Sequence, residues 1–93
     1  MTEDSIRKPR RRERVLATRV DDQVALFDVD VGSYYGLNQV GGRVWELCDG
    51  SRELSDLVAV IGDEYDAPLD VVASDLKALL DDLASENLIV DAG

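Results

Sequence analysis

Apolar and polar residues alternate in the first third of the chain, and apolar residues recur at helical spacing in the remaining two thirds. The alternation predicts strands over residues 14–20, 23–29 and 34–37, because successive strand residues point to opposite faces of a sheet. Turn-forming residues at 21–22 and 30–33 separate these strands. We therefore expect a three-stranded antiparallel meander.

Three helices follow the strands in the predicted order. The first covers residues 39–48 and ends near Gly50, and the second begins at Ser51, which acts as its N-cap. Leu54 would then occupy the N3 position, where a capping box needs an acidic residue or glutamine, so no capping box is expected. A break at residues 66–68 precedes a third helix over residues 69–86. The order βββααα predicts an α+β domain of the winged helix-turn-helix-like type.

Two details of the helices bear on packing. Gly41 and Gly42 weaken the first helix by about 1 kcal/mol each relative to alanine, so we interpret them as a point where another backbone, that of the sheet, approaches closely. In the third helix the apolar spacing marks one buried face. The residues of this face are Leu69, Val72, Leu76, Leu79, Leu80 and Leu83.

The formal charge of −10 is distributed unevenly. Residues 1–14 contain six basic and three acidic residues, whereas residues 15–93 contain four basic and 17 acidic residues. Dense charge and Pro9 predict a disordered basic tail over residues 1–13, ahead of a domain over residues 14–90. The tail is either a solvated segment or an arm that touches an acidic partner or RNA.

Composition excludes several classes of function. No stretch approaches the roughly 20 apolar residues that a membrane span needs, and no signal sequence is present, so we expect a cytoplasmic protein without a membrane partner.

Histidine is absent and Cys48 is the only cysteine, which argues against a metal site, a cofactor or catalysis. We interpret Cys48 as a buried core residue. The acidic body would repel nucleic acid.

The third strand contains the most informative residues. Tyr34 and Tyr35 are adjacent, so one side chain can face the core while the other faces outward. The strand contains no proline, lysine or other charged residue that would block an exposed edge. An extended peptide could therefore add to it as a further strand. The alternative is that this strand lies in the middle of the sheet.

One flank of the third helix complements this edge. At 100° per residue, Asp75, Leu79, Asp82 and Glu86 fall along one side of the apolar face. A groove between this flank and the third strand would have an apolar floor and an acidic wall. The alternative is that these acidic residues are the solvated side of an amphipathic helix.

Through an ordered set of residues, the sequence resembles the PqqD-like peptide-recognition family. Members of this family are called RiPP recognition elements. The resemblance covers residues 14–90. The residues that carry it are Tyr35-Gly36-Leu37-Asn38, Gly42, Val44-Trp45-Glu46-Leu47, Asp49-Gly50-Ser51, Leu54, Leu57-Val58, Tyr65, Asp75-Leu76, Leu79-Leu80, Leu83 and Asn87-Leu88-Ile89.

The resemblance implies a non-catalytic adaptor of lasso-peptide biosynthesis, a branch of antibiotic biosynthesis. It implies that the leader segment of a ribosomally made precursor adds to the third strand, in the cleft against the third helix. A leader peptidase of the cysteine-protease type and a macrolactam cyclase would be the further partners, and the protein would be a monomer or weak dimer. The expected peptide-binding residues are Ser33, Tyr34, Tyr35, Gly36, Leu37, Val72, Asp75, Leu76, Leu79, Asp82 and Leu83.

Two other classes of protein fit this sequence less well. A winged-helix nucleic-acid-binding regulator would have to use the basic N-terminal arm, because the third helix contains one lysine, Lys77, and no arginine follows Arg52. A carrier protein needs an Asp-Ser-Leu sequence at a helix start. Ser55-Asp56-Leu57 and Ser74-Asp75-Leu76 have the wrong order and lie within predicted helices.

Overall fold

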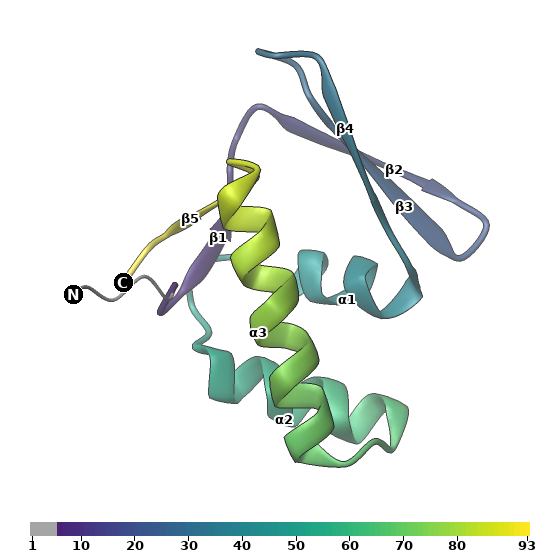
Figure 1. Ribbon diagram of the computed structural model, residues 1–93, viewed down its shortest axis with the longest axis vertical. Helices are drawn as coiled ribbons and strands as arrows, with labels where there is room; N and C mark the ends of the chain where they lie inside the picture. Colours follow the sequence, from purple (N-terminus) through teal and green to yellow (C-terminus); the bar gives the residue numbers. More distant parts are fainter. Residues whose placement is uncertain (1–5) are drawn as a thin grey trace.

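The computed structural model describes residues 6–93, in which a three-stranded sheet lies beside a layer of three helices (Figure 1). Three strands of this sheet followed by three helices confirm the predicted α+β class. Two additional short strands, β1 and β5, pair with each other apart from the sheet. The elements are β1 Pro9–Arg11, β2 Val15–Val20, β3 Gln23–Asp28, β4 Ser33–Leu37, α1 Gln39–Leu47, α2 Leu54–Tyr65, α3 Leu69–Ser85 and β5 Ile89–Asp91.

The sheet is the predicted antiparallel meander, with strand order β2-β3-β4. Strand β4 is therefore an edge, which excludes the alternative that it lies in the middle of the sheet. Leu26 of β3 lies opposite Tyr35 of β4, and Val24 lies opposite Leu37. Both β3 side chains are buried, so this face of the sheet packs on the helices and the other face is open.

Helix α1 packs on the sheet through a close contact at Gly42. The Asn38 side chain caps the helix by accepting a hydrogen bond from the Gly41 N–H at 2.8 Å. A Cβ atom added at Gly42 would lie 2.7 Å from Cγ2 of Val24, so only glycine fits without a shift of the neighbour. The predicted close approach is therefore present, but the neighbour is a side chain of the sheet rather than its backbone.

The start of α2 differs from the prediction. Glu53, not Ser51, is the N-cap, and Asp56 stands at N3, where its carboxylate accepts a hydrogen bond from the Glu53 N–H at 2.9 Å. A capping box is therefore present, although none was predicted. Ser51 is not free to cap the helix, because its N–H and hydroxyl both donate to the carboxylate of Asp49, at 3.0 and 2.6 Å.

The segment that was predicted as a disordered tail contains an ordered strand. Residues 9–11 of β1 pair antiparallel with β5, and Pro9 is buried. Arg11 extends from this strand to the end of α1, where its guanidinium donates to the carbonyl oxygens of Trp45 and Glu46 at 3.0 and 2.8 Å. The prediction is thus corrected for residues 9–11, because their pairing partner lies at the far end of the chain. Residues 1–5 of the predicted tail lie outside the described residues.

The hydrophobic core lies between the inner face of the sheet and the helices. Cys48 is fully buried, as predicted, and burial raises the pKa of its thiol to about 12. Leu69 is an exception to the predicted buried face of the third helix, since it is 58% exposed. Between residues 6 and 93, none of the helices combines the length and apolar character that a membrane span requires.

Candidate functional site

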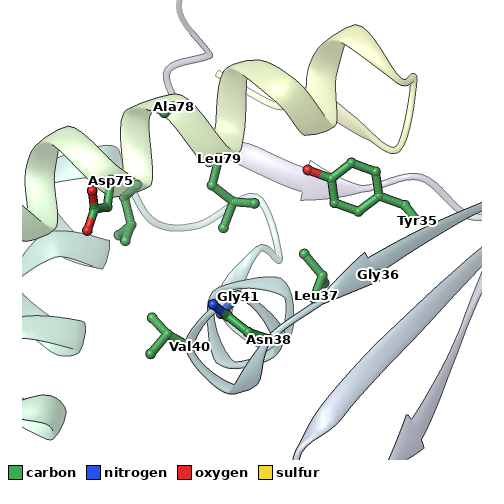
Figure 2. Close-up of a pocket in the computed structure, with 10 residues that line it drawn as sticks. Tyr35, Gly36, Leu37, Asn38, Val40, Gly41, Asp75, Ala78 and Leu79 are labelled. Atoms are coloured by element: carbon green, nitrogen blue, oxygen red, sulfur yellow. The ribbon is translucent and has the colours of Figure 1, made fainter.

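A pocket of about 470 Å³ opens between the free edge of β4, the first turn of α1 and one side of α3. Figure 2 shows Leu79 directed from α3 into the space above α1, with Tyr35 and Leu37 extending from β4. The pocket joins parts of the chain that are far apart in the sequence. Its lining residues are Tyr35, Gly36, Leu37, Asn38, Val40, Gly41, Asp75, Leu76, Ala78 and Leu79.

The two adjacent tyrosines of β4 point to opposite faces of the sheet. Tyr35 is half-buried and lines the pocket, while Tyr34 is 77% exposed on the outer face. There the Tyr34 ring lies 4.9 Å from the ring of Phe27, its partner on β3. This division follows from the two-residue period of a strand, and it assigns only one of the two rings to the pocket.

Helix α3 supplies the opposite wall of the pocket. Asp75 and Leu79 lie on the flank that the helical wheel selected, and Leu76 forms the buried floor. Val72 and Leu83, which the sequence placed among the peptide-binding residues, lie in the core with 5% and 0% of their surface exposed. They support the groove from behind and do not line it.

A hydrogen bond links the two walls at one end of the pocket. The Tyr35 hydroxyl donates to the carboxylate of Asp82 on α3, with 2.5 Å between the oxygen atoms. Burial, the bond to Asp82, the charge of Asp82 and that of Glu86 together raise the pKa of Tyr35 to about 12. The phenol is therefore protonated at every physiological pH and remains a donor to Asp82.

The start of α1 contributes pocket residues that sequence reasoning did not select. Asn38, Val40 and Gly41 line the pocket together with Ala78. A signal was available for Asn38, because an N-cap residue that directly follows an edge strand must bring the first helical turn beside that edge. No comparable signal identified Ala78, because its role depends on how closely α3 approaches the sheet.

The charge of the pocket is acidic. Asp75 is among its lining residues, Asp82 holds the Tyr35 hydroxyl at one end, and the lining contains no lysine or arginine. Leu37, Val40, Leu76 and Leu79 supply the aliphatic part of the surface. Within residues 6–93, no three histidine, cysteine, aspartate or glutamate side chains are grouped as a metal site. The arrangement is suited to holding an extended chain with apolar side chains.

Three of the arginines before β2 form bonds within the fold. Arg12 donates to the buried carboxylate of Asp28 at 2.9 Å, and Arg14 donates to Asp30 at 2.7 Å. Arg11 is likewise bonded to the end of α1, so two cations of the predicted arm, Arg11 and Arg12, are engaged in internal bonds. These internal bonds and the acidic body give the nucleic-acid-binding alternative no support.

Three comparisons with known proteins place the chain among relatives. Residues 23–89 match the family model of Coenzyme PQQ synthesis protein D (PqqD). A PqqA binding protein of Bradyrhizobium diazoefficiens is 29% identical over 55 residues, which are 59% of this chain and 53% of that protein. A PqqA binding protein of Gluconobacter oxydans is 33% identical over 47 residues, which are 50% of this chain and 49% of that protein. The matched segments thus span about half the length of these curated relatives.

Solved structures match over more of the chain. The structure of TbiB1 in complex with the TbiA(beta) leader peptide is 31% identical, covers 86% of this chain and 93% of its own, and superimposes with a TM-score of 0.76. A lasso peptide synthetase B1 complexed with the leader peptide has a TM-score of 0.77, covers 89% of this chain and 98% of its own, and is 19% identical. At this lower identity, the second structure supports the fold alone.

Proposed function

Because the chain belongs to the PqqD family, we propose that it binds the leader segment of a ribosomally synthesised precursor peptide. The observation that carries the proposal is the open edge of β4 directly beside a pocket walled by α3. A leader in extended conformation would add to β4 as a fourth strand of the sheet. Backbone hydrogen bonds would supply affinity, and the pocket would select the side chains.

The chemistry of the pocket defines the peptide that fits. Leu37, Leu76 and Leu79 offer apolar surface to aliphatic or aromatic anchors of the leader. Asp75 and Asp82 place negative charge beside those anchors, and the protein as a whole carries a formal charge of −10. We therefore propose a leader with apolar anchors and some basic residues, which the acidic body would attract.

We propose the lasso-peptide class of precursor, because the similarity to the leader complex of TbiB1 covers 86% of this chain. In this role the protein is a non-catalytic adaptor in the cytoplasm, where precursors are translated. It would present the bound leader to a leader peptidase of the cysteine-protease type and then to a macrolactam cyclase. Two parts of the sequence-based site would contact the leader. The pairing strand would consist of Ser33, Tyr34, Tyr35, Gly36 and Leu37. The wall would consist of Asp75, Leu76, Leu79 and Asp82.

A direct titration tests this function. A fluorescein-labelled peptide that corresponds to the leader of the short reading frame next to this gene is titrated with the protein, and its anisotropy is measured. A PqqA-type precursor serves as an unrelated leader, and a DNA duplex is titrated in parallel at two salt concentrations. Saturable binding of the first peptide, with a Kd of about 1 μM or below and no DNA binding, is expected. Salt-sensitive DNA binding without leader binding would overturn the proposal.

A further inference from the structure

The link between Tyr35 and Asp82 crosses the gap into which a bound peptide would direct its side chains. Ser33, Tyr35 and Leu37 share the inner face of β4, because their partners Asp28, Leu26 and Val24 on β3 are buried. The pocket begins at Tyr35 and continues past Leu37 toward α1. Asp82, which holds the Tyr35 hydroxyl, is not among the lining residues and lies beyond that end.

The geometry of an added strand fixes what Tyr35 would meet. A strand paired to the free edge of β4 lies about 4.8 Å away, and its inward side chains stand opposite the inward side chains of β4. The inward ligand residue opposite Leu37 therefore faces the open, apolar part of the pocket. The ligand residue two positions along stands opposite Tyr35, whose ring extends from β4 toward α3 (Figure 2). There the Tyr35 hydroxyl is bonded to Asp82, so the pair occupies the space.

We propose that the Tyr35–Asp82 pair is the end wall of the groove and determines the register of the bound peptide. The ligand then carries a bulky apolar residue opposite Leu37 and, two residues away, a small residue such as glycine, alanine or serine opposite Tyr35. The pattern is the same for a parallel and an antiparallel ligand, because strand side chains alternate with a period of two in both. This inference rests on the proposed leader-binding function and names which leader residue the site restricts.

The wall depends on the hydrogen bond as well as on the ring. Tyr35 is anchored on an edge strand, and Asp82 is the side chain that holds its hydroxyl against α3. Without this bond the ring can rotate about χ1 toward solvent and open the end of the groove. Tyr35→Phe and Asp82→Ala therefore test the bond, whereas Tyr35→Ala removes the wall itself.

The experiment uses the labelled leader peptide described above and a set of variants in which each residue in turn is replaced by tryptophan. For the native protein, we expect the tryptophan replacement at one leader position, the one opposite Tyr35, to lower the affinity at least about tenfold. The replacement two residues away, opposite Leu37, should be tolerated. Tyr35→Ala should reduce that loss to about threefold or less, and Tyr35→Phe should give an intermediate value. Tyr34→Ala, a change at the adjacent outward tyrosine, is the matched control and should keep the full loss.

The outcomes separate this inference from the function on which it rests. If the native protein binds no peptide of the set, the proposed function fails and the inference with it. If the native protein binds the parent leader but Tyr35→Ala, Tyr35→Phe and the native protein share one tolerance profile, the end wall is wrong and leader binding stands. Far-ultraviolet circular dichroism of each variant confirms that the fold is retained.

Discussion

The guanidinium of Arg12 lies 2.9 Å from the carboxylate of Asp28, whose side chain is 2% exposed. Asp28 also accepts a hydrogen bond from the N–H of Asp30 at 3.0 Å, so the buried carboxylate is held from both sides. Among residues 6–93, Asp28 is the charged side chain that is buried in the core. The basic segment before β2 therefore neutralises a charge that the meander has buried.

Loss of Arg12, the partner of the buried Asp28 carboxylate, should destabilise the fold. Arg12→Ala leaves the Asp28 carboxylate buried with only the Asp30 N–H, and we expect the free energy of unfolding to fall by about 2 to 3 kcal/mol. Arg14→Ala is the matched control, because the Arg14–Asp30 pair is 65% and 46% exposed and should contribute about 0.5 kcal/mol or less. Urea denaturation measures the free energy of unfolding of both variants. Equal midpoints for the two variants would contradict a structural role for Arg12.

Sequence patterns predicted the elements whose interactions are local. The β2-β3-β4 meander follows from alternation and from turns such as that at Asp21, which adopts a left-handed φ of 58°. The helices follow from apolar spacing. The β1-β5 pair could not be predicted in this way, because each strand has three residues and the partners are separated by almost the whole chain. Charge density suggested a solvated tail, whereas long-range pairing determined the structure.

The same distinction applies to the groove. The opposite facing of the two tyrosines of β4 and the flank containing Asp75 and Leu79 were accessible to sequence reasoning, because strand period and helical wheel define faces. The wheel could not decide how deeply each residue lies. Val72 and Leu83 share the apolar face with Leu79 but are covered by the rest of the core. Depth depends on how closely α3 approaches the sheet, and local spacing does not contain that information.

Gly42 should tolerate no side chain. In Gly42→Ala the new Cβ would lie 2.7 Å from Cγ2 of Val24, which forces α1 and β3 apart, and we expect a loss of about 1 to 3 kcal/mol despite alanine's better helix propensity. Gly36→Ala on β4 is the control, because nothing lies within 4 Å of its added Cβ. Thermal unfolding compares the two. A Tm for Gly42→Ala equal to that of Gly36→Ala would show that the helix moves away without cost.

Cys48 should react slowly in the folded protein. Its thiol is buried and its pKa is raised to about 12, chiefly by burial, so the reactive thiolate is scarce at pH 8. We expect iodoacetamide to label the native protein at least about 100-fold more slowly than the protein unfolded in urea. Ser74→Cys, on the exposed side of α3, should add one thiol that reacts quickly. Labelling of Cys48 at the rate of that added thiol would show frequent opening of the core.

Tyr35 should make the stability depend on alkaline pH. Its pKa rises from 10.0 in the unfolded chain to about 12 in the fold, so the folded state holds the proton more tightly. The resulting stabilisation is complete below pH 10 and is lost as the pH rises from about 10 to about 12. The difference in urea midpoint between the native protein and Tyr35→Phe should therefore shrink from pH 9 to pH 11. Cys48 titrates in the same range in both proteins and cancels in the difference. A difference that is independent of pH would mean that neither burial nor the contact with Asp82 raises the pKa of the phenol in the fold.

Leu79 should be essential for leader binding, because its half-buried side chain lines the pocket opposite β4. Leu79→Arg replaces apolar surface with a cation that a basic leader would repel, and we expect its Kd to rise at least about tenfold. Leu69→Arg is the matched control, since Leu69 belongs to the same helix, is 58% exposed and lies outside this pocket. Its affinity for the labelled leader should stay within about twofold of the native value. Because both variants introduce the same charge into α3, a general electrostatic effect would weaken the two equally, and only a contact at the pocket would separate them. Equal loss in both would therefore place the leader elsewhere on the protein.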